Sequence, residues 1–370
     1  MARLTVSAHG GDVYSAAREL GCNPTEILDF SASINPLGPS PHVWKAITAS
    51  RHLLNHYPDP NCWDLRKALA MFWRIDPEQI VVGNGSSELI DAIPRALAIR
   101  RLLVVQPTFS EYAAAMVRAG GEAMSLYADR RDLYAIPVDH LCRVMETGHI
   151  NGRSIDGLLL CHPNSPTGQA CSVDDVARLA RAARKRGLWL IIDEAFADYC
   201  PERSVLPYVS AWPHVAILRS MTKFYALPGL RVGYAVARPT IIGRLRRQLT
   251  PWSTSVMGQV AALAALDDTA HARKSLSFMG RERERFRKSV AALPGCVVMP
   301  TCANYFLVEL PRGRPARDIT GQLQSKGLLI RDCSSVPGTN SRSIRLAVRT
   351  VQENDRLVRT LSHLLAADVS

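Results

Sequence analysis

A chain of 370 residues, of which 47% are hydrophobic and 21% charged, can bury a large core, which we expect to be split between a large and a small lobe. No apolar run reaches the roughly 18 residues of a membrane-spanning helix and no signal-peptide core follows Met1, so we expect a cytoplasmic protein that does not bind a membrane. The nine cysteines form no C-x-x-C pair, so we expect neither a metal site nor a disulfide framework. The net charge of +12 allows an attraction to anionic partners or a generally arginine-rich composition, and because no nucleic-acid-reading module accompanies it, we predict no nucleic acid partner.

Short apolar runs bounded by turn residues alternate with helical patterns over the first two thirds of the chain. We predict strands at 80–82, 102–105, 157–160, 188–192, 215–218 and 232–236, and helices at 88–99, 110–119 and 174–186. This alternation is typical of parallel strands joined by crossover helices. The sequence therefore predicts a doubly wound α/β domain with a mostly parallel sheet.

The pattern changes after Pro239, where long helical stretches follow without intervening strands. We predict helices at 240–249, 255–265, 270–293, 316–326 and 352–366, and strands at 296–299, 305–310, 328–331 and 343–348. We therefore expect a smaller α+β domain to begin at residue 240, with element boundaries uncertain by about 2–4 residues.

A single lysine, Lys223, stands between Ser220 and Thr222 on one side and Arg231 on the other. A lysine that condenses with an aldehyde must lose its proton near neutral pH, so it needs burial or a cationic neighbour. The two hydroxyls and the arginine can hold the phosphate of a phosphorylated aldehyde. A solvated loop lysine is the alternative explanation, and the other segments of the chain argue against it.

Two further segments supply matching parts. Asp193 ends the apolar run 188–192, which places its carboxylate at the carboxyl edge of the sheet, where open α/β sheets bind ligands. Gly85 and Ser86 follow a strand and open a helix, whose positive end can bind phosphate. Taken alone, either segment could be an ordinary helix cap.

Together these segments resemble the fold-type I pyridoxal-phosphate enzymes, the aspartate aminotransferase superfamily, over nearly the whole chain. Within it, the opening His9-Gly10-Gly11-Asp12 and the run at 29–38 are most similar to the threonine-phosphate decarboxylases of cobalamin biosynthesis, with histidinol-phosphate aminotransferases the nearest cousins. The resemblance implies pyridoxal 5′-phosphate as cofactor and a homodimer with shared active sites. It also implies that residues 1–35 join 240–370 in the small domain, leaving 36–239 as the large cofactor-binding domain.

The resemblance also implies roles for individual residues. Lys223 would carry the cofactor and Asp193 would hold its pyridine nitrogen protonated. The remaining cofactor contacts would come from Gly85, Ser86, Ser220, Thr222 and Arg231 at the phosphate, Phe109 over the ring, Asn164 at the phenolic oxygen, and Tyr57 across the dimer. The substrate's anionic groups would be bound by His9, Asn35, Arg331 and Arg345.

Two positions depart from the superfamily's pattern. Ser165 stands directly before Pro166, where the pattern has asparagine, so Asn164 would be the donor after a shift of one residue. Phe196 stands where aminotransferases usually carry a tyrosine, which removes one hydrogen bond to the cofactor's phenolic oxygen.

The resemblance favours decarboxylation of L-threonine O-3-phosphate to (R)-1-amino-2-propanol O-2-phosphate. Transamination of a compound such as histidinol phosphate is the alternative, because the same cofactor shell serves both reactions. O-phosphoserine is another candidate substrate, since one methyl group contributes only about 1–3 kcal/mol to discrimination. A regulator without catalysis is disfavoured, because Lys223, Asp193 and Arg231 are all present.

Overall fold

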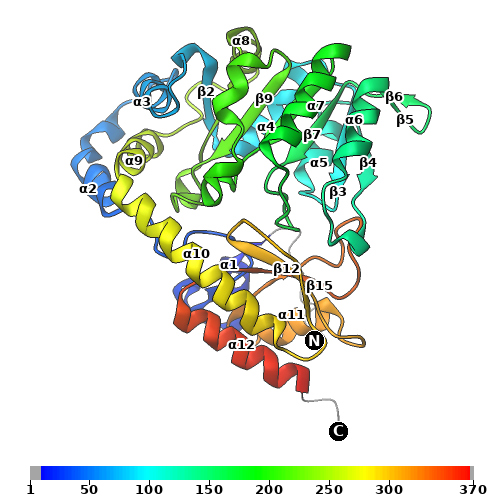
Figure 1. Cartoon of the computed structure of the whole chain (residues 1–370). Coiled ribbons are helices and arrows are strands. Elements are labelled where there is room, and N and C mark those ends of the chain that lie inside the picture. The colour runs from blue at the N-terminus through cyan, green and yellow to red at the C-terminus, as the bar shows by residue number, and fades with distance from the viewer. Residues whose placement is uncertain (1–9, 367–370) are drawn as a thin grey trace.

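The structure is a computed structural model that describes residues 10–366, and His9, predicted to bind substrate, lies outside this range. Figure 1 shows two lobes, with the large lobe above, the small lobe below, and α10 (Thr269–Ala291) running from one to the other. Over the described range, no helix combines the length and the apolar character needed to cross a bilayer.

The large lobe contains a seven-stranded sheet in the order β2-β10-β9-β8-β7-β3-β4. Its strands are β2 (Ile80–Asn84), β3 (Arg101–Gln106), β4 (Glu122–Tyr127), β7 (Gly157–Cys161), β8 (Trp189–Asp193), β9 (Val215–Ser220) and β10 (Val232–Ala237). Neighbouring strands are parallel except β10, which runs antiparallel to both β2 and β9. The predicted mostly parallel sheet is confirmed, and β4 is an addition to it.

Helices cover both faces of this sheet. They are α2 (Pro41–Ala49), α3 (Trp63–Trp73), α4 (Gly85–Ala96), α5 (Glu111–Arg118), α6 (Val138–Thr147), α7 (Val173–Arg186), α8 (Pro239–Arg246) and α9 (Val256–Asp267). Along β7, Leu158 and Leu160 pack into one core, which includes residues of α3, α6, α7 and α9. Leu159 packs into the opposite core with residues of α4, α5 and α8. A strand buried on both faces reads as an unbroken apolar run, which is how the sequence located it.

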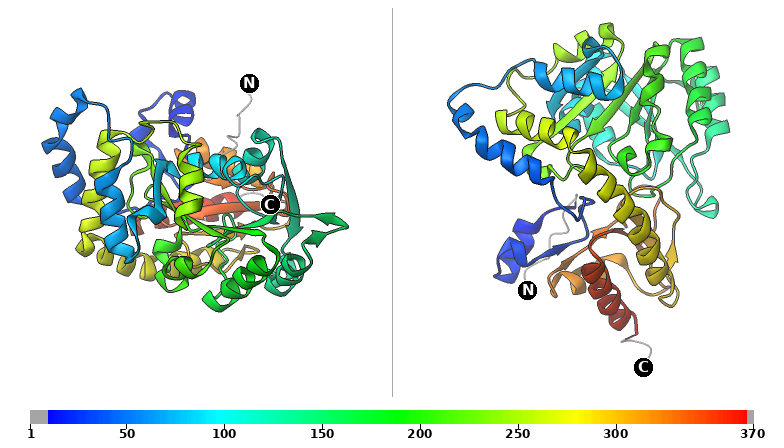
Figure 2. Two further views of the ribbon diagram at one scale, coloured as in Figure 1. Left: turned by 90° about the horizontal axis from the view of Figure 1, so that it is seen from above. Right: turned by 60° about the vertical axis from the view of Figure 1, so that its left-hand side comes forward.

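The small lobe has a four-stranded sheet in the order β11-β12-β15-β14, covered by long helices. Its elements are β11 (Val297–Val298), β12 (Tyr305–Glu309), β14 (Arg331–Asp332), β15 (Ser343–Ala347), α10, α11 (Ala316–Gln324) and α12 (Val351–Ala366). The N-terminal segment, with α1 (Val13–Leu20), lies beside this lobe (Figure 2, right). Its strand β1 (Leu28–Asp29) pairs in parallel with β13 (Leu328–Leu329).

Short elements connect the rest. These are the ribbon of β5 (His149–Ile150) and β6 (Arg153–Ser154), and the 3-10 turns η1 (Pro24–Glu26), η2 (Arg51–Asn55), η3 (Pro77–Gln79), η4 (Arg130–Asp132), η5 (Ala197–Tyr199), η6 (Pro201–Arg203), η7 (Leu206–Ala211) and η8 (Pro228–Leu230).

The helices after Pro239 divide between the lobes differently from the predicted boundary at 239/240. Ile241 and Ile242 of α8 pack into one core of the large sheet. Ala261 of α9 packs into the other. Phe286 of α10 packs into the small-lobe core. We therefore propose that the small domain begins with α10, because amphipathic helices without strands look alike in sequence whichever lobe they cover.

Candidate active site

The central residues meet at the carboxyl edge of the large sheet. Asp193 is the last residue of β8 and Ser220 the last of β9, and these strands are parallel neighbours. Lys223 follows β9 by three residues, so its loop begins at the same edge. Because parallel strands bring their carboxyl ends together, residues 30 positions apart in sequence converge here.

The surroundings of the Lys223 amine favour its neutral form. Burial, followed by the positive charges of Arg345 and Arg231, lowers its pKa from 10.5 to about 8. The carboxylate of Asp193 opposes this shift only partly. The loop is held by its backbone, since the Lys223 carbonyl oxygen accepts hydrogen bonds from the Asn35 N–H (3.0 Å) and the Tyr199 hydroxyl (3.3 Å). A partly neutral amine is what attack on an aldehyde requires.

This pKa gives a testable pH dependence. In the cofactor-free protein, modification of Lys223 by trinitrobenzenesulfonate should accelerate as pH rises through about 8, since only the neutral amine is nucleophilic. Replacing Arg345 with methionine should move the midpoint upward, because a positive charge that disfavours the protonated amine is removed. Peptide mapping at each pH measures the midpoint. A wild-type midpoint near that of a free lysine, about 10.4, would contradict the arrangement.

Asp193 is 3% exposed and bound by two donors. The Tyr112 hydroxyl donates to Oδ2 at 2.8 Å, and the Ala195 N–H donates to Oδ1 at 2.9 Å. Burial raises the pKa of Asp193, while these hydrogen bonds and the charge of Lys223 lower it. Tyr112 also packs edge-on against Phe109, with ring centroids 5.6 Å apart. This contact could not be predicted from the sequence, because Tyr112 and Asp193 are 81 residues apart.

The predicted phosphate-binding residues lie together around β10. Gly233 pairs with Ser220 on one side and with Gly83 on the other, which brings the start of α4 next to the end of β9. The hydroxyls of Ser220 and Thr222 are 2.6 Å apart. Gly85 has φ +74, and a Cβ placed on it would lie 2.6 Å from Nη2 of Arg231. Hydroxyls, a helix N-terminus and a guanidinium thus converge as a phosphate requires.

Gly85 therefore offers a selective test of this predicted phosphate site. An alanine there must displace the Arg231 guanidinium, so we expect Gly85→Ala to lower the affinity of the protein for pyridoxal phosphate by roughly tenfold or more. Gly148→Ala is the matched control, since Gly148 also has φ +74 but has no neighbour within 4 Å. Both variants should lose about 1 kcal/mol of stability from backbone strain. Equal cofactor affinities in reconstitution titrations of the two variants would contradict the predicted phosphate site.

The side-chain amide of Asn164 uses both of its protons and its oxygen in hydrogen bonds within the protein. Its two amide protons are donated to the Pro107 carbonyl and the Thr167 hydroxyl, both at 2.8 Å, and its Oδ1 accepts from Thr108 at 2.8 Å. In this arrangement both amide protons are donated within the protein, and the role of Asn164 at the cofactor's phenolic oxygen stays a prediction. Ser165 accepts a hydrogen bond from Arg345 and keeps its own proton, so we propose Ser165 as the donor at this position.

Asn35 is likewise occupied. Its amide donates to the Phe224 carbonyl (2.9 Å) and to the Ser275 hydroxyl (2.8 Å), while its Oδ1 accepts from the Leu37 N–H (3.1 Å). These contacts fix the segment next to Lys223, and the contact of Asn35 with substrate stays a prediction. The sequence could not reveal this, because both partners of the amide lie more than 180 residues away.

Arg331 and Arg345 are cross-strand partners on β14 and β15. Arg345 donates to the Ser165 hydroxyl (2.9 Å) and the Ser31 carbonyl (2.6 Å), and among the described residues its buried Nε has no hydrogen-bond partner. Burial and the charge of Arg345 lower the pKa of Arg331. Two guanidinium groups on paired positions favour an anionic ligand between or beside them.

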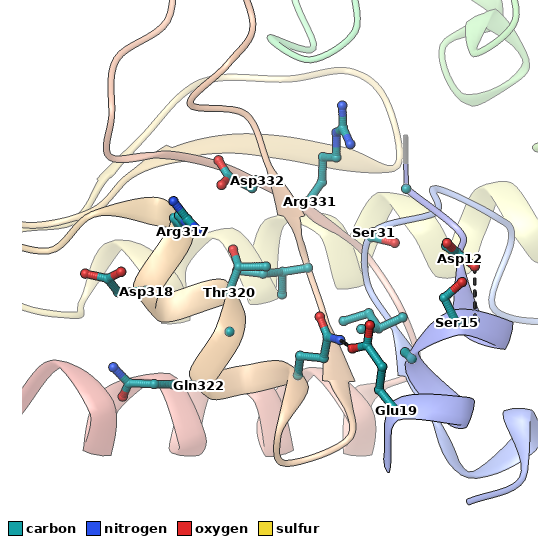
Figure 3. Close-up of a pocket in the computed structure, with 16 residues that line it drawn as sticks. Asp12, Ser15, Glu19, Ser31, Arg317, Asp318, Thr320, Gln322, Arg331 and Asp332 are labelled. Atoms are coloured by element: carbon teal, nitrogen blue, oxygen red, sulfur yellow. Dashed lines mark hydrogen bonds between the residues drawn. The ribbon is translucent and has the colours of Figure 1, made fainter. Parts of the chain in front are cut away.

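A cavity of about 460 Å³ adjoins this arginine pair. Arg331 and Ser31 line it, together with residues of α1 and α11. Figure 3 shows the Arg331 side chain extending from its strand away from Glu19 and Gln322 at the far end. Lys223 and Asp193 do not line this cavity, so it meets the site only at the arginine end.

Phe109 and Tyr57 occupy different settings. Phe109 is partly buried beside Tyr112, at the edge that holds Asp193. Tyr57 is 82% exposed and packs on Trp252 with ring centroids 5.2 Å apart. The stacking of Phe109 on the cofactor ring and the contact of Tyr57 with the cofactor of a partner subunit stay predictions.

Comparisons with known proteins identify the family of the chain. The family Aminotransferase class I and II matches residues 25–361. The chain is 35% identical over 361 residues to a threonine-phosphate decarboxylase of Salmonella typhimurium, covering 97% of each chain. It is 33% identical to a histidinol-phosphate aminotransferase of Roseiflexus castenholzii, covering 94% of this chain and 92% of that one. A crystal structure of the histidinol-phosphate aminotransferase from Clostridium acetobutylicum matches with TM-score 0.85 and 25% identity, over 92% and 100% of the two chains. The chain belongs to the Aminotransferase class I and II family and is a pyridoxal-phosphate-dependent enzyme, as predicted.

Proposed function

We propose that this member of the family decarboxylates L-threonine O-3-phosphate to (R)-1-amino-2-propanol O-2-phosphate. The observation that supports the proposal is the arginine pair: Arg345, whose charge acts on Lys223, lies opposite Arg331 on the neighbouring strand. A substrate with a carboxylate and a phosphate needs two such cations. The 35% identity with a protein named threonine-phosphate decarboxylase supports it.

Each residue of the site would have a separate role in the reaction. The bound cofactor supplies an aldehyde that joins to amines and a ring that accepts the electron pair left when carbon dioxide departs. Asp193 keeps a proton on the ring nitrogen, and Ser220, Thr222 and Arg231 hold the phosphate. Arg331 and Arg345 hold the substrate's anionic groups and so orient the bond that breaks. Lys223, freed by the substrate's amine, returns one proton to Cα in place of the lost carboxylate.

Orientation decides between decarboxylation and its alternative. The bound cofactor would supply the ring that accepts the electron pair, and the position in which Arg331 and Arg345 hold the substrate would decide which bond at Cα breaks. Binding energy from the remote phosphate can hold that orientation. Transamination of histidinol phosphate remains the second candidate, favoured by the 33% identity with a protein of that name.

The deciding experiment supplies purified holoenzyme with carboxyl-labelled L-threonine O-3-phosphate and no 2-oxo acid. We expect stoichiometric release of labelled carbon dioxide, with O-phosphoserine turned over less efficiently by roughly 10- to 200-fold. Turnover that requires 2-oxoglutarate, with histidinol phosphate as the better amine donor, would favour the aminotransferase instead.

We also propose that the protein forms a homodimer through the large lobe. Large hydrophobic side chains are exposed on neighbouring segments there: Trp44, Leu54, Tyr57, Trp63, Phe72 and Trp252. An apolar surface of this kind is characteristic of an interface between chains. Sedimentation equilibrium should give twice the chain mass of 40.7 kDa.

A further inference from the structure

Tyr305 is a fully buried tyrosine that contacts Arg345 and both lobes. The Arg345 guanidinium carbon lies 5.1 Å from the centroid of its ring. Its hydroxyl donates to the Asn164 carbonyl at 3.0 Å, and its ring meets that of Phe196 edge-on, with centroids 4.8 Å apart. A residue of the small lobe thus binds the loop of the large lobe that carries Ser165.

Strand register explains why these side chains meet. β12 and β15 are antiparallel, and Arg345 lies directly opposite Leu307. Tyr305 is two residues from Leu307 and so projects from the same face of the sheet, diagonal to Arg345. Diagonal neighbours of this kind are within reach when the side chains are long or aromatic.

The contact fixes the plane of the guanidinium. A cation packs on the face of an aromatic ring, whereas its N–H groups donate in the plane of the guanidinium. Two of these in-plane donors already bind Ser165 and Ser31, and the buried Nε has no partner among the described residues. The ring of Tyr305 therefore helps to set the direction in which Arg345 presents its remaining N–H donors.

The same ring also links Arg345 to the catalytic lysine. The amine of Lys223 lies 5.7 Å from the centroid of Phe196, which in turn packs on Tyr305. The rings of Phe196 and Tyr305 therefore form a chain of contacts from the Lys223 amine to the Arg345 guanidinium. A smaller side chain at position 305 would let Arg345 move relative to Lys223.

We propose that Tyr305 is a positioning residue that orients Arg345 and thereby selects which bond at Cα of the substrate breaks. This rests on the proposed function, in which Arg345 holds an anionic group of the substrate. Loss of the ring should weaken substrate binding and also misalign the carboxylate, so that proton loss at Cα competes with loss of carbon dioxide. When the proton leaves Cα and the phosphate then leaves Cβ, hydrolysis would release ammonia and a 2-oxo acid.

The test compares Tyr305→Leu, which removes the ring, with Tyr305→Phe, which keeps the ring and removes the hydroxyl. Tyr134→Leu is the control for loss of a buried tyrosine, because Tyr134 is 1% exposed but packs in the large-lobe core. Calorimetry measures the dissociation constant for L-threonine O-3-phosphate on borohydride-reduced holoenzyme, which cannot turn over. Product analysis of active holoenzyme measures the ratio of 2-oxo product to carbon dioxide.

We expect Tyr305→Leu to raise the dissociation constant roughly tenfold or more and to increase the share of 2-oxo product, while Tyr305→Phe stays within about threefold of wild type. Rescue by phenylalanine would exclude a purely structural role of the hydroxyl. Unchanged binding and product ratio in Tyr305→Leu, or equal changes in Tyr134→Leu, would overturn the proposal. Because binding is measured without turnover, a wild-type protein that releases no carbon dioxide would refute the proposed reaction while leaving the role of Tyr305 to be decided by the dissociation constants.

Discussion

Lys223→Ala should abolish turnover, with a fall in kcat of roughly 10³-fold or more, because the variant loses both the amine that binds the cofactor and the acid that returns a proton to Cα. The variant should still bind pyridoxal phosphate noncovalently, since Ser220, Thr222, Gly85 and Arg231 are unchanged. Its absorbance should therefore be that of the free aldehyde. Rapid kinetics and spectra of the reconstituted variant measure both effects.

Lys223→Arg sharpens this test. Arginine restores the positive charge and much of the volume, but it cannot lose its proton in the accessible pH range. We expect Lys223→Arg to be as inactive as Lys223→Ala. Activity above a few per cent of wild type in the arginine variant would show that charge, rather than a neutral amine, is what the position supplies.

Asp193→Asn should lower kcat by roughly 10²- to 10³-fold, because the neutral amide no longer keeps a proton on the ring nitrogen and the ring accepts electrons less well. The substitution preserves the shape, because Oδ1 of the amide can still accept the Ala195 N–H while its Nδ2 donates to the Tyr112 hydroxyl oxygen. The fold should therefore survive. Single-turnover release of carbon dioxide isolates the chemical step from cofactor loss.

Asp156→Asn provides the matched control at the opposite edge of the sheet. Asp156 stands just before β7, and its Oδ2 accepts the N–H groups of Arg100 (2.8 Å) and Arg101 (2.7 Å). We expect a modest loss of stability and an unchanged kcat. Equal kcat losses in the two variants would mean that Asp193 acts only through the fold.

Much of the fold could be predicted because strands buried on both faces form continuous apolar runs, as in 157–160 and 188–192. β4 escaped prediction, since Glu122–Tyr127 lies at a sheet edge and shows neither an unbroken apolar run nor a strict alternation of polar and apolar residues. The antiparallel direction of β10 could not be predicted either, because strand direction depends on the path of the chain and not on composition. The placement of α8 and α9 on the large lobe depends on the same long-range packing.

Where one segment carries the signal, as at Lys223, Asp193 and the start of α4, the sequence alone yields a prediction, and the roles of these residues stay predictions. The site could not be predicted where function depends on contacts between distant segments. Tyr112 reaches Asp193 across 81 residues, and Tyr305 reaches Asn164 across 141. The hydrogen bonds that the side-chain amides of Asn164 and Asn35 make within the protein could not be predicted either. A motif shows which residue is present but not which partners its polar atoms have.

Reduction of the holoenzyme with borohydride, followed by peptide mass spectrometry, tests the central claim most directly. The chain contains seven lysines, and we expect a phosphopyridoxyl group on Lys223 alone, with none in Lys223→Ala. Modification of another lysine in its place, or no modification of a catalytically active protein, would contradict the account.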